Sequence, residues 1–114
     1  FAVSIGNVHG LYTTPKKLDL TLLEKIRGSV DCFLSLHGGS GISDDQIRHA
    51  IAVGRIVKIN ISSELRQALR QGLEHSLQSQ PNEVAMYKIT PAAIENVQKI
   101  VESKMKLFGS SHKV

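Results

Sequence analysis

Three short strand-like segments, each followed at once by a polar or glycine-containing motif, constrain the fold of this 114-residue chain most strongly. They are Phe1–Ile5, Cys32–Leu36 and Arg55–Ile59, and a segment with helical periodicity follows each of them. Strands that alternate with helices indicate parallel βαβ units, in which ligands gather at the carboxyl ends of the strands. The sequence therefore predicts an α/β fold with polar chemistry at one edge of a parallel sheet.

The segment after the second strand carries the strongest chemical signal. His37 ends the strand, Gly38, Gly39 and Ser40 form a glycine-rich turn, and a helix signal begins at Ser43. Backbone N–H groups at a helix start favour phosphate, and glycines let the backbone approach it closely. This order of residues places an imidazole beside a candidate anion site, which favours metal-assisted chemistry on a phosphorylated small molecule.

A second histidine–glycine pair, His9-Gly10, closes the first strand. A lone histidine in this position is more often structural than a metal ligand. The repetition of the pair at His37 changes that balance, because two imidazoles at adjacent strand ends can face one cavity, and neutral imidazole suits zinc. A catalytic zinc site usually needs three protein ligands, so these two histidines do not complete one.

The segments GNVHGLY, LHGGSGISDDQIRHAI and VKINISSELR occur in this order, and the chain ends in KMKLFGSSHKV. Together they resemble the class II, metal-dependent ketose-bisphosphate aldolases, which include the fructose- and tagatose-bisphosphate aldolases. The resemblance implies a (β/α)8 TIM barrel, a zinc ion, and reversible cleavage of a ketose 1,6-bisphosphate to dihydroxyacetone phosphate and glyceraldehyde 3-phosphate. It also implies a role in carbohydrate metabolism such as glycolysis, a cytoplasmic location and a homo-oligomer, either dimer or tetramer.

The resemblance assigns roles to residues at all three strand ends. It makes His9 and His37 zinc ligands and brings the Asn60 amide to the enediolate, although Asn60 could also simply begin a helix. Many members carry Thr or Asp where this chain has a serine pair, which leaves the exact ketose open. The residues that the resemblance places on dihydroxyacetone phosphate are Gly10, Gly38, Gly39, Ser40, Asn60, Ile61, Ser62 and Ser63.

Chain length limits how much of a barrel these residues can form. A complete barrel of this type needs about 250 residues. The sequence begins inside a strand and without Met, so we expect residues 1–114 to form the C-terminal portion of one TIM-barrel domain, with strands six to eight. The third zinc ligand and the general acid/base are expected upstream.

Two alternatives to an enzyme remain open. One is a non-catalytic sugar-phosphate-binding or regulatory remnant of an aldolase, either alone or as part of a larger multidomain protein. The other is a structural half-barrel that assembles with a second copy or with its missing half, since exposed edges of parallel strands need cover. Lys58 on the third strand could also indicate a class I aldolase, in which a lysine forms an imine, but the histidine–glycine pairs argue against that.

Composition excludes several other classes of protein. The net charge is +4, but the basic residues are scattered and aromatic residues make up only 4%, so nucleic-acid binding is not expected. No apolar segment approaches the length of a membrane span, so no membrane partner is expected. Cys32 is the only cysteine and is predicted to be a small buried core residue.

Helix signals are strong after each strand and at the C-terminus. Ser43 and Gln46 form a predicted capping box, and Gly54 is the predicted end of that helix. The last helix is predicted to start at Pro91, with Thr90 as N-cap, to end at Gly109, and to pack on a barrel wall or at a subunit contact. A helix over 63–77 carries a leucine stripe, predicted to be core: Leu65, Leu69, Leu73 and Leu77.

The remaining histidines and carboxylates are predicted to be ordinary surface or capping groups. They are His49, His75, His112, Glu24, Asp44, Asp45, Glu64 and Glu74.

Overall fold

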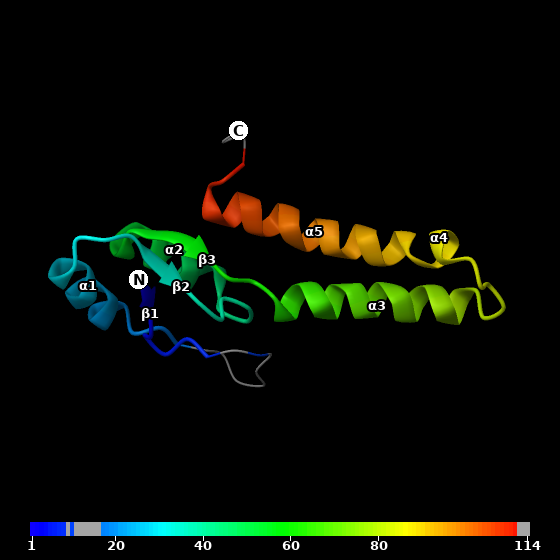
Figure 1. Ribbon diagram of the computed structural model, residues 1–114, viewed down its shortest axis with the longest axis horizontal. Coiled ribbons are helices and arrows are strands. Elements are labelled where there is room, and N and C mark those ends of the chain that lie inside the picture. The colour runs from blue at the N-terminus through cyan, green and yellow to red at the C-terminus, as the bar shows by residue number, and fades with distance from the viewer. Residues whose placement is uncertain (9, 11–16, 112–114) are drawn as a thin grey trace.

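The structure is a computed structural model that describes residues 1–8, 10 and 17–111. Within these residues the chain forms three strands and five helices (Figure 1). The predicted metal ligand His9 and the tail residue His112 lie outside the described residues. In chain order the elements are β1 (Ala2–Val3), α1 (Leu20–Ser29), β2 (Leu34–Leu36), α2 (Asp44–Gly54), β3 (Ile56–Ile59), α3 (Ser63–Ser79), α4 (Met86–Ile89) and α5 (Pro91–Phe108).

The strands form one parallel sheet in the order β1-β2-β3, as the alternation of strands and helices predicts. Each strand is shorter than its predicted segment. Val3 pairs with Leu36, and Leu36 pairs with Ile59 on its other side, so the last residues of all three strands lie in one row. The loops that follow the strands therefore start at the same edge of the sheet.

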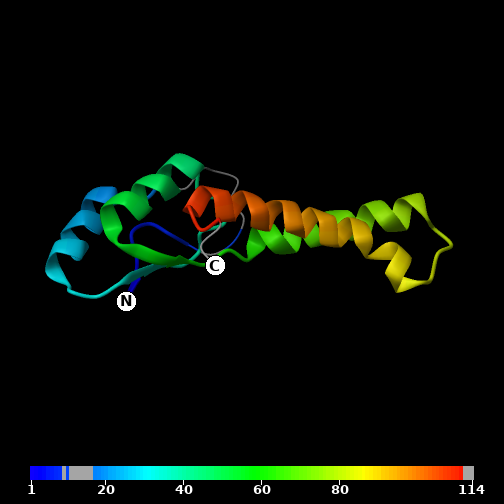
Figure 2. The same ribbon diagram turned by 90° about the horizontal axis from the view of Figure 1, so that it is seen from above.

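Helices α1 and α2 cover one face of this sheet (Figure 2). Leu23 of α1 and Ile47 of α2 are almost fully buried in a cluster with the strand residues Leu34, Leu36 and Ile56. Apolar residues of both helices meet alternate residues of the strands, as expected for helices that pack on a parallel sheet. Ser35, between the buried Leu34 and Leu36, lies on the opposite face and is half-buried. Val57 is 63% exposed and lies at an irregularity in the register between β2 and β3.

Residues 63–108, called the helical arm below, project away from the sheet (Figures 1 and 2). Helices α3 and α5 lie side by side along the arm, and α4 lies at its far end. The arm gives the chain a radius of gyration of 17.2 Å, whereas a compact domain of this length has about 13 Å. No helix in the described residues is both long and apolar enough to cross a membrane.

Small residues, rather than the predicted leucine stripe, form the contact between α3 and α5. The buried residues of α3 are Ala68, Gly72 and Ser76, and α5 buries Ala93. The prediction was wrong for two leucines, because Leu69 is 44% exposed and Leu77 is 52% exposed. Helices that approach this closely need small side chains at the contact, so bulky residues lie at its flanks.

Two of the predicted helix caps differ in detail from the structure. Ser43 precedes α2, but Gln46 Nε2 donates to the Ser43 hydroxyl at 3.1 Å, and Gln46 Oε1 accepts from the Leu18 N–H at 2.6 Å. Gln46 thus ties the chain before α1 to α2 instead of closing a capping box. Thr90 is the N-cap residue of α5 by position, as predicted, but its side chain makes no cap bond. Its hydroxyl donates instead to the carbonyl of Met86 in α4, a helix that the sequence analysis missed.

The end of α2 and both ends of α5 lie where the sequence predicts them. Helix α2 ends at Gly54, although the left-handed residue is Arg55, with φ 50°. Helix α5 starts at Pro91 and is closed by Gly109, which has φ 66° and donates its N–H to the carbonyl of Lys106. Glycine adopts this left-handed conformation without a steric penalty.

The prediction of a buried Cys32 was wrong, because the residue is exposed. The predicted strand began at Cys32, but β2 begins at Leu34. Cys32 therefore lies in the exposed approach to the sheet, before the positions that pack against the helices.

Candidate active site

The loops after β2 and β3 are joined to each other by backbone hydrogen bonds. The Asn60 N–H donates to the Leu36 carbonyl at 3.0 Å, and the Gly39 N–H donates to the Asn60 carbonyl at 2.9 Å. Gly38 and Gly41 adopt positive φ angles of 61° and 77°, so the chain turns sharply on either side of this contact. The pairing continues the sheet past the strand ends and fixes both loops relative to each other.

Gly39 lies where a larger residue would crowd its neighbours. A Cβ atom at this position would lie 2.7 Å from Ile59 Cγ2, 2.9 Å from Ile61 Cδ1 and 3.1 Å from the Asn60 carbonyl oxygen. Its N–H already donates to Asn60. Gly39 therefore allows close packing of the two loops, and its predicted contact with substrate phosphate stays a prediction.

Ser40 links the glycine-rich loop to the start of α3. Its side chain is almost fully buried, and its Oγ accepts from the N–H groups of Ser62, at 3.2 Å, and Glu64, at 3.4 Å. A helix start leaves backbone N–H groups without intrahelical partners, and here a serine from another loop satisfies two of them. Ser62, the N-cap residue by position, makes no side-chain cap bond.

A hollow of about 220 Å³ opens where these loops meet the start of α3. Six of the eight residues predicted to bind substrate line it, and Gly39 packs beside the half-buried Ile61 of the loop after β3. The three serines supply hydroxyl groups, and the positive end of the α3 dipole lies at the same place. The lining residues are Gly10, Gly38, Ser40, Asn60, Ser62 and Ser63.

The Asn60 side chain connects the predicted metal ligand His37 to this hollow. The Asn60 Nδ2 atom lies 3.2 Å from Nδ1 and 3.5 Å from Nε2 of the half-buried His37 ring. A neutral imidazole has one donor and one acceptor nitrogen, so Asn60 can donate to whichever nitrogen lacks the proton. Asn60 is therefore shared between the imidazole and the hollow.

Asn7 holds the backbone of His37 and was missed by the sequence analysis. Its Nδ2 donates to the carbonyls of Val3, at 3.1 Å, and His37, at 3.0 Å, while its Oδ1 accepts from the Ile5 N–H at 2.7 Å. One side chain thus ties the end of β1 to the end of β2. The available signal was an asparagine in the turn directly after a strand, a position where its side chain commonly bonds to nearby backbone.

The residues present fit a metal only in part. His37 offers a half-buried imidazole at a strand end, with its backbone fixed by Asn7, which suits a metal ligand. The part of the chain that the structure describes contains no group of three or more histidine, cysteine, aspartate or glutamate side chains that could hold a metal ion. A metal site built on His37 would need further ligands, and the sequence analysis predicts His9 as one of them.

Comparison with known proteins identifies the family. The family described as "Fructose-bisphosphate aldolase class-II" matches residues 1–113. The chain belongs to the class II fructose-bisphosphate aldolase family. The prediction drawn from the three motifs is therefore confirmed at the level of the family.

Individual relatives named as aldolases match nearly all of this chain. The sulfofructosephosphate aldolase of Alkalicoccus urumqiensis and the fructose-bisphosphate aldolase of Geobacillus stearothermophilus are each 38% identical over 112 residues, or 98% of this chain. The crystal structure of the YdjI aldolase from Escherichia coli K12 matches with a TM-score of 0.79 and 38% identity, again over 98% of this chain. The chain spans only 39 to 40% of the length of these relatives.

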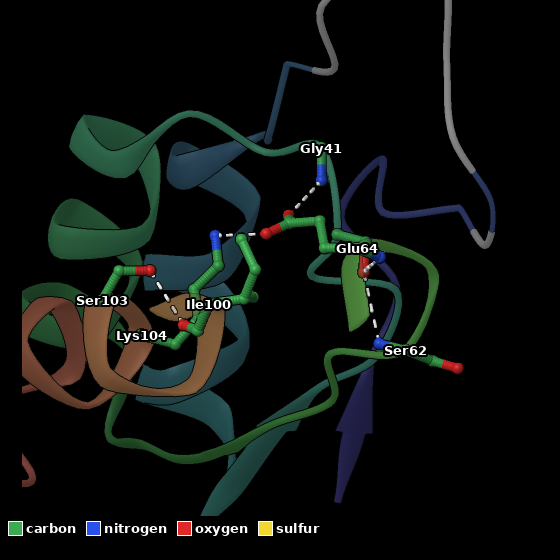
Figure 3. Close-up of polar contacts among 7 residues, drawn as sticks. Gly41, Ser62, Glu64, Ile100, Ser103 and Lys104 are labelled. Atoms are coloured by element: carbon green, nitrogen blue, oxygen red, sulfur yellow. Dashed lines mark hydrogen bonds and ion pairs between the residues drawn. The ribbon is translucent and has the colours of Figure 1, made fainter. Parts of the chain in front are cut away.

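The similarity to aldolases includes the helical arm, since 98% of the chain is aligned with the YdjI structure. A residue of the last helix also contacts the framework of the site. Lys104 of α5 forms an ion pair with Glu64, at 2.8 Å, and Glu64 accepts from the Gly41 N–H at 2.8 Å (Figure 3). Glu64 was predicted to be a surface or capping charge, but it is part of the loop framework. Its partner lies 40 positions away, and no local pattern indicates that contact.

Proposed function

We propose that this chain forms part of an aldolase that cleaves a ketose 1,6-bisphosphate to dihydroxyacetone phosphate and glyceraldehyde 3-phosphate with the help of zinc. One observation carries the proposal: Asn60 lines the hollow at the start of α3 and also contacts the His37 imidazole. A metal-binding candidate and a phosphate-binding candidate are thus neighbours, as a substrate with a carbonyl close to a phosphate requires.

The phosphate end of the substrate would lie in the hollow. The hydroxyls of Ser62 and Ser63 and the start of α3 offer hydrogen bonds and a positive dipole to a phosphate. Ser40 Oγ accepts from the Ser62 and Glu64 N–H groups and so holds the start of α3, with its serine hydroxyls, beside the hollow. These contacts would fix the substrate against the metal centre and supply orientation.

His9 and His37 are the residues that would hold zinc, together with ligands from elsewhere in the protein. Zinc would act as a Lewis acid on the ketose carbonyl. Asn60 would position its amide beside the reacting carbon–oxygen group and donate a hydrogen bond as negative charge develops on that oxygen. Asn7 would keep the His37 ring at a constant position through its bond to the His37 carbonyl.

We also propose that β1, β2 and β3 are the last three strands of a (β/α)8 barrel. Parallel pairing in sequence order and helices on one face of the sheet support this arrangement. The face of the sheet that carries Ser35, opposite α1 and α2, would then face the barrel interior. The phosphate hollow would lie at the carboxyl end of the strands, where barrels of this type place their ligands.

The test uses the natural full-length product that carries this sequence. Metal analysis should find zinc in the purified protein, and a chelator should abolish cleavage of fructose 1,6-bisphosphate. His37→Ala should lower both zinc content and activity, whereas His49→Ala, at an exposed position of α2, should change neither. Borohydride with substrate should trap no adduct on Lys58.

Sulfofructose phosphate should be assayed alongside, because relatives with two different substrate names are equally identical to this chain. Absence of zinc and of activity towards both substrates would reject the enzyme in favour of a non-catalytic remnant of an aldolase.

A further inference from the structure

The ion pair between Glu64 and Lys104 differs from the other ion pairs of the described residues in its shielding. The two side chains are 19% and 16% exposed, while the pair Glu95–Lys99 on α5 is 65% and 66% exposed. An exposed pair contributes little, whereas a shielded one is strongly unfavourable when only one charge is removed.

Glu64 holds the glycine-rich loop at two consecutive residues. Its backbone N–H donates to Ser40 Oγ at 3.4 Å, and its side-chain Oε1 accepts from the Gly41 N–H at 2.8 Å. Gly41 has φ 77° and an open surrounding, so packing alone does not fix its conformation. The carboxylate of Glu64 anchors it through the Gly41 N–H (Figure 3).

This arrangement places a negative charge close to a candidate phosphate site. Glu64 directly follows Ser63, and Gly41 directly follows Ser40, and both serines line the hollow. A lone carboxylate here would repel a phosphate. Lys104 supplies the compensating charge at 2.8 Å from Glu64 Oε2, and its stem lies along an apolar hollow that includes Ile59 and Leu65.

We propose that Glu64 and Lys104 form a positioning pair for the phosphate of the substrate. The Glu64 carboxylate holds the glycine-rich loop, and the Lys104 ammonium group compensates the negative charge of that carboxylate. The proposal rests on the proposed function only in naming the phosphate as that of the substrate. Neither residue touches the reacting atoms. Their effect is on phosphate affinity, so it should be seen in KM and in the binding of inorganic phosphate.

The test compares charge removal with charge balance in the natural full-length protein. Lys104→Met leaves Glu64 unpaired and should weaken inorganic phosphate binding, measured by calorimetry, on the order of tenfold. KM should rise by a similar factor, with kcat changing much less. The double variant Glu64→Gln with Lys104→Met keeps an acceptor for the Gly41 N–H without a charge, and it should recover most of the lost affinity.

Two further variants separate this role from a general loss of structure. Lys99→Met, which removes an exposed ion pair from the same helix, should leave phosphate affinity unchanged. Lys104→Arg keeps the charge and should retain affinity close to that of the unaltered protein. Equal affinity of Lys104→Met and the double variant, or an arginine variant as weak as the methionine one, would overturn the proposal.

Calorimetry keeps this result separate from the fate of the proposed reaction. An inactive protein that binds phosphate with the expected order of affinities supports the positioning pair and rejects the aldolase reaction. An active protein in which all variants bind phosphate alike rejects the pair alone. Absence of phosphate binding in the unaltered protein rejects the pair as well.

Discussion

At the carboxyl edge of the sheet, loops are joined by polar contacts that cross between elements, whereas the helical arm is joined by close packing of small residues. Asn7, Ser40 and Glu64 each bond to a segment other than their own. In the arm, Gly72 lies against the backbone of Ala93, and the bulky side chains at its flanks remain exposed.

The difference teaches how each region tolerates change. A buried polar group that loses its partner pays a desolvation cost, so the site depends on the chemistry of a few side chains. A close helix contact depends on volume, since even one methyl group must be accommodated. Four substitutions test this contrast through the free energy of unfolding in urea, measured on the natural full-length protein.

The largest loss of stability is expected for Gly72→Ala in the arm. A Cβ atom there would lie 2.4 Å from Ala93 Cα and 2.6 Å from Ala93 N, both backbone atoms that cannot rotate away. The cost of overpacking, about 3 kcal/mol, exceeds the gain of about 1 kcal/mol from the better helix propensity of alanine.

Gly28→Ala is the matched control for this substitution. Gly28 lies in α1 with nothing within 4 Å of an added Cβ, so the same change should stabilise the protein. Stabilisation by Gly72→Ala as well would show that the two helices are not in close contact.

Asn7→Asp should have the next largest effect, about 1.5 kcal/mol of destabilisation. Aspartate has nearly the same shape but turns the Nδ2 donor into an acceptor that faces the carbonyls of Val3 and His37. Activity should fall as well, because the His37 backbone loses its anchor. Asn82→Asp, at an exposed position between α3 and α4, is the control and should change neither quantity.

Gly39→Ala should destabilise the protein less than Gly72→Ala, by about 1 kcal/mol. The nearest atoms to an added Cβ are methyl groups of Ile59 and Ile61, which can shift, although the Asn60 carbonyl oxygen at 3.1 Å also resists. The shift moves the loops that line the hollow, so phosphate affinity should fall more than stability. A variant with lower stability and unchanged phosphate affinity would separate Gly39 from the site.

Sequence patterns located the site because its chemistry follows the strands directly. The glycine-rich turn, Asn60 and the serine pair lie within a few residues of their strand ends, and parallel pairing brings those ends together. The resemblance to class II aldolases added roles that spacing alone does not give. Those roles, including zinc binding by His9 and His37, remain predictions.

Contacts between distant segments could not be predicted in this way. Lys104 reaches Glu64 from another helix, and Ser40, rather than the local Ser62, satisfies the start of α3. The leucine stripe of α3 was misjudged for a related reason. Periodicity shows which residues share a face, but the distance between two helices decides whether leucine or glycine fills the contact.

The smallest effect is expected at the tip of the arm, for Glu83→Gln. The bond that Lys88 donates to Glu83 lowers the pKa of this carboxyl below its ordinary value of 4.5, and the N–H of Ala85 adds to the shift. A carboxyl with a lowered folded-state pKa stabilises the fold above its unfolded-state pKa, and this contribution is lost as the pH falls through the folded-state pKa. The urea midpoint of the unaltered protein should therefore slightly exceed that of the variant at neutral pH, and the gap should close as the pH falls below 4.5. A gap that stays constant with pH would show that the Glu83 charge plays no part, in contrast to the shielded Glu64.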